Sequence, residues 1–416
     1  MKEASQGSVD HLFRQESGKM IAVLSKQFGI HYIDTIEDAV QDAFVKAFQS
    51  WKINGQPPNP IGWLYLAAKN KTIDLLRRER RKSEIFQEKL IPNSATEAAQ
   101  DYYSEYEIED SQLRMMFAIC HPTLKSDDQI ALVLKIISGF SMKEIANALL
   151  INLDSVKQRV SRAKRKIKSE KIDLHIPTGS VLQDRIENVM TVLYLMFNEG
   201  YYSTTQAIPI RKDLCMEAMR LTKILSEHKI STDQNVYALL ALMCYHASRF
   251  ESRLNQANHW ITLESQDRSL WNKELIQVAN YYMKKAAQDH PFHIYQIEAA
   301  IAAIHCHSTS LESTDWERLL ILYEALLVKK PFPVIELNIA IVHIQMDGLD
   351  EAGLILKKLE GALNNYPLYH MVKAELAVKQ NDLNEANNLL LEALSLAKNE
   401  HEKQVITAKM TSLNTG

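Results

Sequence analysis

The sequence predicts an all-α protein in which two small helical domains are followed by an α-solenoid. Apolar residues recur at helical spacing along almost the whole chain. Its 416 residues include only 12 Gly and 11 Pro, too few for the many turns of a β-rich fold. A pattern that returns every 34 residues near the C-terminus indicates stacked helix pairs. The length exceeds that of one ordinary core, so we expect several domains.

Composition is that of an ordinary globular protein, with 46% hydrophobic and 24% charged residues. The N-terminus lacks an apolar signal region, and no segment approaches the ~18 apolar residues of a membrane span. We therefore expect a cytoplasmic protein that does not contact membranes and holds no metal or cofactor. The cysteines form no CxxC pair, which argues against disulfides and structural zinc; they are Cys120, Cys215, Cys244 and Cys306.

Positive charge is concentrated in two short stretches of a nearly neutral chain. Residues 1–175 hold 26 Lys and Arg against 23 Asp and Glu, whereas the remainder holds 22 against 28. Residues 69–82 carry seven basic and two acidic side chains, and residues 157–171 carry eight and one. Residues 97–110, which lie between them, have six acidic side chains and no basic one. Two separate basic clusters favour contact with nucleic acid.

The first domain, residues 8–90, is expected to contain two amphipathic helices. Asp34 and Glu37 have the spacing of a capping box before EDAVQDAFVKAFQSW (37–51), and KINGQPPNP (52–60) ends that helix. Its apolar face comprises Val40, Ala43, Phe44, Ala47, Phe48 and Trp51. The next helix carries a polar stripe of Asn70, Asp74, Arg77 and Arg81. Acidic residues 91–110 are assigned to a linker.

The second domain, residues 111–173, contains a helix-turn-helix pattern. Ser141 and Glu144 form an S-x-x-E capping box that starts a short helix, and Asn152 is placed to cap the next one. That second helix buries a stripe of Val156, Val160, Ala163 and Ile167. We expect its polar residues to point outward, as in a helix that enters the major groove. The alternative for this helix is an ordinary solvated basic helix in a bundle. The alternative for the other basic stretch, residues 69–82, is a charged helix end whose cations complement the helix dipole.

The remainder, residues 180–416, is expected to be helical throughout. DWERLLILYEALL (315–327), LDEAGLILKKLEG (349–361) and LNEANNLLLEALS (383–395) lie 34 residues apart, the tetratricopeptide period. Three registers share this period: Glu317, Glu351 and Glu385; Leu322, Leu356 and Leu390; Pro333 and Pro367. Residues 181–310 show no clean period. Gly200 in FNEGYY (197–202) is expected to end a helix.

No catalytic residue is predicted. The only concentration of potential ligands is His293, Glu298, His305 and His307, but residues 305 and 307 face different sides of a helix and make a poor metal pair. Core or interface histidines are the better interpretation. Phosphate-binding glycine loops, HExxH and nucleophile elbows are absent from the sequence.

Taken together, residues 8–172 resemble the extracytoplasmic-function sigma factors, the promoter-specificity subunits of bacterial RNA polymerase. The motifs are EDAVQDAFVKAFQSW, PIGWLYLAAKNKTIDLLRRERR and GFSMKEIANALLINLDSVKQRVSRAKRKI, in the family's order. AICHPTL, VLYLMFNEGYYS and LESQDRSLWNKELI resemble the subgroup with a long tetratricopeptide-like C-terminal extension. The loop KINGQPPNP has its own sequence, so promoter preference is not carried over.

The resemblance implies three binding surfaces: one for the polymerase core, through its β′ clamp helices and β flap, and two for promoter DNA. Candidate core contacts are Glu37, Asp38, Gln41 and Asp42. Candidate contacts to the −10 element are Asn70, Lys71, Asp74, Arg77 and Arg78, beside the loop 52–60 and the aromatic Trp51, Trp63 and Tyr65. Candidate contacts to the −35 element are Ser155, Lys157, Gln158, Arg159, Ser161, Arg162, Lys164 and Arg165.

The leading interpretation is therefore a non-catalytic sigma factor. We expect the acidic extension to regulate it by packing on the sigma domains, or to bind a peptide partner. A stand-alone helix-turn-helix regulator with a ligand- or peptide-sensing solenoid is the alternative, and it would bind promoter DNA without polymerase.

Overall fold

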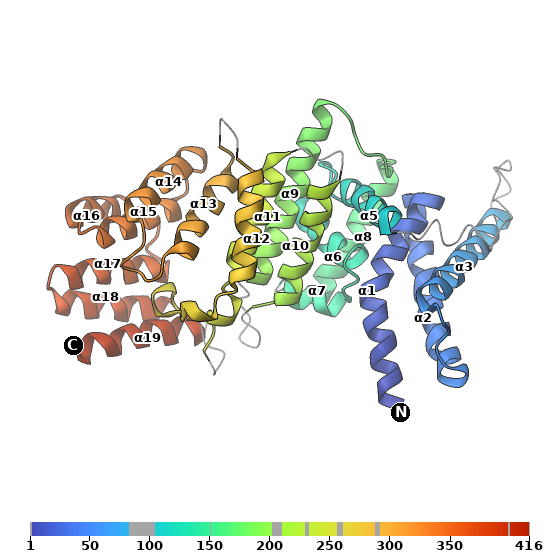
Figure 1. Ribbon diagram of the computed structural model, residues 1–416, viewed down its shortest axis with the longest axis horizontal. Coiled ribbons are helices and arrows are strands. Elements are labelled where there is room, and N and C mark those ends of the chain that lie inside the picture. The colour runs from blue at the N-terminus through green and yellow to red at the C-terminus, as the bar shows by residue number, and fades with distance from the viewer. Residues whose placement is uncertain are drawn as a thin grey trace. The chain divides into compact units, whose positions relative to one another are not determined.

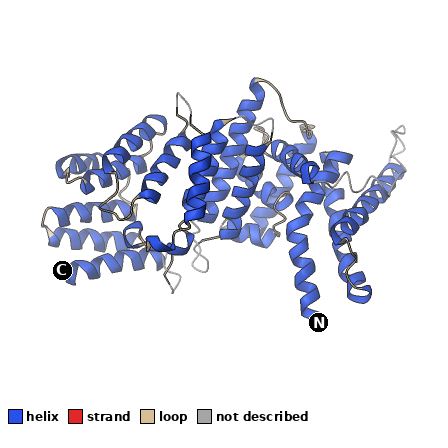
Figure 2. Ribbon diagram, viewed as in Figure 1, coloured by secondary structure: helices blue, strands red, loops and turns tan. Residues whose placement is uncertain are grey.

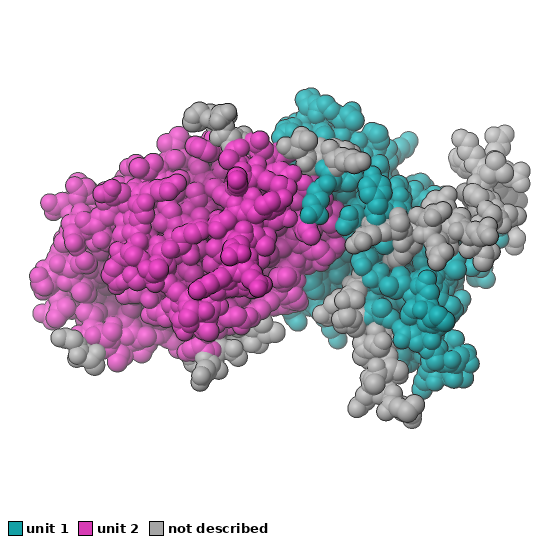
Figure 3. Space-filling model, viewed as in Figure 1, with its two compact units in different colours: residues 1–196, 227–231 teal, residues 197–226, 232–416 magenta. Residues whose placement is uncertain are grey.

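The computed structural model describes residues 2–82, 105–149, 151–201, 210–228, 233–255, 261–287, 292–397 and 400–415. Within these ranges the elements are helical and include no β-strand (Figure 2), which confirms the predicted all-α class. The chain divides into two compact units, coloured separately in Figure 3. Unit 1 comprises residues 1–196 and 227–231, and unit 2 comprises residues 197–226 and 232–416.

The first helical domain consists of long helices (Figure 1): α1 (Lys2–Phe28), the 3-10 turn η1 (Ile30–Tyr32), α2 (Ile33–Asn54) and α3 (Pro60–Lys82). The predicted apolar face of α2 is buried at Val40 and Ala43, whereas Phe48 is 37% exposed. The predicted capping box of α2 is wrong. Because η1 runs directly into the helix, α2 begins at Ile33 without a side-chain cap, and Asp34 lies inside its first turn.

The helix-turn-helix domain contains α5 (Glu105–Ile119), α6 (Ser126–Ile136), α7 (Met142–Ala148) and α8 (Leu153–Ser169). The capping box is confirmed: Ser141 Oγ accepts from the backbone N–H of Glu144, and the Glu144 carboxylate accepts from the backbone N–H of Ser141. Asn152 caps α8 by accepting from the backbone N–H of Ser155 at 2.7 Å. The predicted buried stripe of α8 is confirmed at all four positions. Residues 91–104 of the predicted linker lie outside the described residues, whereas residues 105–110 are not linker but form the first turns of α5.

Helix α9 (Ser180–Tyr201) follows the helix-turn-helix domain, and most of it belongs to unit 1. The buried Arg185 guanidinium donates to the carbonyl oxygen of Phe117, and the Asn188 side-chain amide donates to that of Cys120. These bonds engage carbonyls at the C-terminal end of α5, where intrahelical partners run out. The first helix after residue 180 therefore supports the helix-turn-helix domain.

Gly200 does not end α9, which continues to Tyr201. A Cβ atom at this position would lie 2.7 Å from Sγ of Cys215 on the next helix. The glycine therefore permits close packing of two helices, a role that the sequence does not distinguish from a helix stop.

Unit 2 begins with α10 (Lys212–Glu227), α11 (Gln234–Ala247), α12 (Lys273–Lys285) and α13 (Ile294–His307). The 3-10 turns η2 (Phe250–Ser252), η3 (Leu263–Ser265) and η4 (Arg268–Leu270) join α11 to α12. Helix α11 is buried on nearly all sides because α12 and α13 pack against it.

The C-terminal part of unit 2 contains α14 (Trp316–Lys329), α15 (Pro333–Gln345), α16 (Leu349–Lys358), α17 (Pro367–Lys379), α18 (Leu383–Leu396) and α19 (Glu400–Thr415). Pro333 and Pro367 each occupy the first turn of a helix, where the missing N–H costs nothing. Leu356 and Leu390 are buried at equivalent positions of α16 and α18. The 34-residue spacing therefore corresponds to a repeated helix pair, as predicted.

Candidate nucleic-acid interface

Helix α8 presents a polar face opposite its buried stripe. Lys157, Gln158, Ser161 and Arg165 are exposed, and Ser155 is half-buried beside the N-cap. Lys157 Nζ lies 3.1 Å from Oδ1 of Asp154, an exposed pair that solvent weakens. These side chains can reach a ligand without any rearrangement of the helix.

Two arginines of α8 pair instead with α6. The Arg162 guanidinium donates through Nε to Oδ2 of Asp128 at 2.6 Å and through Nη2 to Oδ1 at 2.5 Å, a bidentate pair with a buried carboxylate. Arg159 Nη2 lies 2.9 Å from Oδ2 of Asp127. Both pairs fix α8 on α6, so these arginines hold the helix in position in this conformation.

Lys164 does not point outward as expected. Its side chain is 14% exposed, and Nζ lies 2.8 Å from Oδ1 of Asp34 and 2.6 Å from Oε2 of Glu37, both on α2. Lys168 Nζ reaches Oδ2 of Asp34 at 2.6 Å, and Lys135 Nζ reaches Oε1 of Glu37 at 3.0 Å. These five residues form what we call the α2–α8 cluster, and it joins the two domains of unit 1.

The charges of the α2–α8 cluster stabilise one another. Burial raises the pKa of Asp34, but hydrogen bonds from Lys164 and Lys168 outweigh it and hold that pKa below its ordinary value. Burial lowers the pKa of Lys164, but Glu37 and Asp34 outweigh it and raise that pKa. The ionised states of Asp34 and Lys164 therefore both favour the packed arrangement.

The predicted core-contact residues of α2 differ in accessibility. Glu37 is 7% exposed and is occupied by the α2–α8 cluster, whereas Asp38 and Gln41 are exposed. Asp42 Oδ2 lies 2.5 Å from Nζ of Lys71 on α3. Burial and the neighbouring Glu37 raise the pKa of Asp38. Glu37 and Asp38 thus form a region of dense negative charge that Lys164 partly neutralises.

The predicted −10 residues lie on α3 and the loop before it. Asn70, Asp74, Arg77 and Arg78 are exposed along the helix, and Lys71 is half-buried in its pair with Asp42. The rings of Trp51 and Trp63 pack edge to face, with centroids 5.6 Å apart, at the base of the exposed loop. Tyr65 is fully buried and its hydroxyl accepts from Nε2 of Gln27, so it belongs to the core.

Three cluster members were not predicted: Asp34 was expected only as a cap, and Lys135 and Lys168 were not assigned a role. Their ion-pair partners are about a hundred residues away in sequence, and no local sequence pattern predicts ion pairs over such a separation. Gly18 marks the same junction, because a Cβ there would lie 2.0 Å from the carbonyl oxygen of Ile137. A glycine inside a long helix was the one available signal of close backbone approach.

The histidines and the glutamate of segment 293–307 do not converge on a common ligand site. His293 caps α13, and Glu298 pairs with Lys330 at 3.4 Å. Burial, together with Arg249 and Arg268, lowers the pKa of His305 to about 4. Among the described residues, no group of His, Cys, Asp and Glu could hold a metal ion, and no helix is long and apolar enough to cross a membrane.

Comparison with known families divides the chain into three matched parts. Residues 12–82 match sigma-70 region 2, and residues 115–167 match sigma-70 region 4. Residues 185–287 match a family of unknown function, DUF6596, whose match begins at the residue that contacts α5. The first two matches cover the helices that carry all the candidate residues above, and they point to a non-enzymatic transcription factor.

Two relatives extend this comparison. The chain is 32% identical over 383 residues to an uncharacterised protein of Rhizobium meliloti (strain 1021), covering 92% of this chain and 90% of that protein. It is 28% identical over 166 residues to the ECF RNA polymerase sigma factor SigE of Mycolicibacterium smegmatis, covering 40% of this chain and 62% of that protein. No solved structure matches the chain.

Proposed function

We propose a mechanism from one premise: the chain belongs to the sigma-70 family, as an extracytoplasmic-function-like sigma factor with a C-terminal helical extension. Proteins with these domains work with RNA polymerase and promoter DNA in transcription initiation. In our proposal, α8 reads the −35 element, α3 and the loop before it read the −10 element, and α2 docks on the polymerase core.

The −35 assignment rests on the construction of α8. Both helices of the motif are capped by their own side chains, and the buried stripe leaves Lys157, Gln158 and Arg165 on the outer face. Gln and Arg side chains can make bidentate contacts with base edges, whereas Lys and Ser hold phosphates. This exposed face, on a helix whose N-terminus is capped by Asn152, is the observation that supports the proposal most.

The −10 assignment rests on the exposed side of α3. Arg77 and Arg78 supply cations for the phosphates of a melted strand, and Asn70 supplies hydrogen bonds to bases. The loop 55–59 before α3 is open, because Gly55 ends α2 with a positive φ and has no atom within 4 Å of a Cβ position. A flipped base would be received between this loop and the helix.

The α2–α8 cluster suggests that this conformation is a resting state. Glu37, a proposed polymerase contact, and Lys164, a proposed DNA contact, satisfy each other. Neither can meet its external partner until the two domains separate. We therefore infer that polymerase, presenting cations to α2, replaces Lys164 and releases α8 toward DNA.

The C-terminal extension is connected through α9 to the helices that must move when the two domains of unit 1 separate. Arg185 and Asn188 of α9 hold the end of α5, and α5 is also held by Lys26 of α1 through Glu107 at 2.7 Å and Asp110 at 2.6 Å. A change in unit 2 that pulls on α9 would move α5 relative to α1. We propose that the extension regulates opening in this way.

The decisive experiment is transcription from host genomic DNA by core polymerase with the purified full-length protein, with start sites mapped. Defined starts sharing −35 and −10 motifs are expected. Gln158→Ala and Arg165→Ala should reduce those transcripts several-fold, while Lys357→Ala, an exposed change on α16, should not. Absence of specific starts together with absence of core binding would contradict the proposal.

The alternative, a stand-alone regulator, makes a different prediction. It would shift duplex promoter DNA in a gel without polymerase, whereas the resting state described above requires polymerase for tight binding. A gel-shift on the mapped promoters, with and without core polymerase, separates the two.

A further inference from the structure

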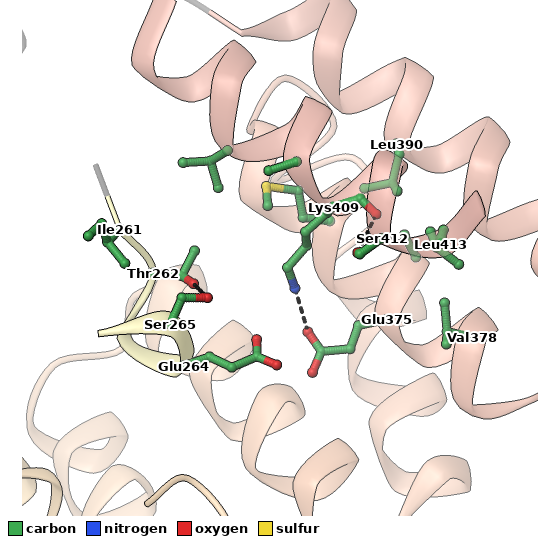
Figure 4. A pocket seen from close by; sticks show the side chains of 14 residues that line it. Ile261, Thr262, Glu264, Ser265, Glu375, Val378, Leu390, Lys409, Ser412 and Leu413 are labelled. Atoms are coloured by element: carbon green, nitrogen blue, oxygen red, sulfur yellow. Dashed lines mark hydrogen bonds and ion pairs between the residues drawn. The ribbon is translucent and has the colours of Figure 1, made fainter. Parts of the chain in front are cut away.

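Unit 2 contains a cavity that none of the proposed functions uses. Its volume is about 510 Å³, within the range typical of small-molecule sites. One wall is the segment 261–265, which includes η3, and the other comes from α17, α18 and α19 (Figure 4). The cavity therefore lies between chain segments about a hundred residues apart, within one unit.

The cavity has an apolar part and a charged part. Val378 and Leu413 supply apolar surface, and Val378 is 37% exposed, so this surface is open to a ligand. The ionisable residues of the lining are Glu264, Glu375 and Lys409. Figure 4 shows the Glu264 carboxylate turned toward the pair formed by the other two. A ligand can therefore place an apolar body and a polar head in different parts of one cavity.

The charged part is acidic. Lys409 Nζ lies 3.2 Å from Oε2 of Glu375, whose other oxygen accepts from Nε2 of Gln345 at 2.8 Å. Lys409 is thus already neutralised by one carboxylate, and the second, on Glu264, has no ion-pair partner among the described residues. The formal charge of the lining is −1, so an incoming anion is opposed and a cation is favoured.

We propose that this cavity binds a small organic cation: an amine or guanidinium head on an apolar body. The head lies between Glu264 and Glu375, and the body lies on Val378 and Leu413. The inference does not depend on sigma activity, and it would give the extension a ligand to sense.

Binding is tested on the full-length protein without polymerase or DNA, so its outcome is separate from that of the proposed function. Three probes share one body: 2-phenylethylamine, neutral 2-phenylethanol and anionic 3-phenylpropionate. Calorimetry and ligand-observed NMR should show the amine binding about threefold more tightly than the alcohol, since a charge pair with the exposed Glu264 carboxylate is screened by solvent and contributes a factor of this size. The acid should bind most weakly.

Variants assign the binding to this cavity. Glu264→Gln should reduce amine affinity about threefold, to that of the alcohol, and leave alcohol affinity unchanged. Glu400→Gln, on the same helix as Lys409 but outside the cavity, is the matched control. Ala408→Trp fills the cavity from an exposed position and should abolish binding of all three probes. Equal binding of amine and alcohol, tighter binding of the acid, or no binding by any probe would each overturn the proposal.

Discussion

Lys164 is the residue at which two surfaces of this sigma factor compete. It contributes the same ammonium group to the proposed −35 surface and to the α2–α8 cluster, where it is 14% exposed. Removing it leaves Glu37 with Lys135 alone, at 3.0 Å. Loss of one partner from a largely buried ion pair costs more than the pair contributes, because the remaining charge stays desolvated.

We therefore predict that Lys164→Met opens unit 1. The variant should bind core polymerase about tenfold more tightly, since Glu37 then has to be released from Lys135 alone rather than from two lysines. Arg165→Met, one position along on the exposed face, removes the same charge without touching the cluster and is the control. The measurement is titration of labelled protein with core enzyme. Equal affinities for both variants would show that the cluster does not restrain docking.

The pKa shifts of Asp34 and Lys164 predict how the closed state, the conformation in which the α2–α8 cluster is formed, responds to pH. The Asp34 pKa is lowered, so its stabilising contribution is present above the ordinary carboxyl value of about 4 and is lost as pH falls through the lowered value. The Lys164 pKa is raised, so its contribution is present below about 10 and is lost as pH rises through the raised value.

The contributions of Asp34 and Lys164 to the closed state should therefore be constant between about pH 5 and 9 and should be lost only outside this window. The distance between fluorophores on α2 and on the C-terminal end of α8 measures opening of the closed state. In Asp34→Asn the acid-induced opening should shift or disappear. An opening transition near pH 6.5 would instead indicate a histidine outside the cluster.

At the scale of elements, local rules explain which helices were predictable. The caps of α7 and α8 and the four buried positions of α8 depend on residues three or four apart, and sequence alone located them. The predicted cap of α2 was wrong because η1 precedes that helix. The predicted role of Gly200 as a helix stop was wrong because its role depends on contact with a neighbouring helix, which no local sequence pattern contains.

The N-cap of α8 gives a test at this scale. Asn152→Ala should lower the free energy of unfolding of unit 1 by about 1 kcal/mol, because the Ser155 backbone N–H loses its acceptor. Asn152→Asp keeps an acceptor oxygen and should recover most of that loss. Chemical denaturation monitored by circular dichroism gives both values. If the Asp variant is as unstable as the Ala variant, the cap contributes little.

At the scale of the whole molecule, the sequence predicted the order of the domains but not their interdependence. A boundary near residue 180 was expected, and α9 does begin there. However, most of α9 lies in unit 1, because Arg185 and Asn188 bind carbonyls at the end of α5. Such a contact joins residues 68 positions apart, which periodicity does not address.

Truncation should reveal this dependence. A chain ending at Asp173 leaves the end of α5 without its donors, whereas one ending at Tyr201 keeps them. Two lost hydrogen bonds, at about 1–3 kcal/mol each, should lower the melting temperature of the shorter chain by on the order of 10 °C relative to the longer. Arg185→Leu in the full-length protein should weaken protection of the α5 amides in hydrogen exchange. If the chain ending at Asp173 is as stable as the longer one, α9 is a passive linker and the proposed route from the extension to the sigma domains must be abandoned.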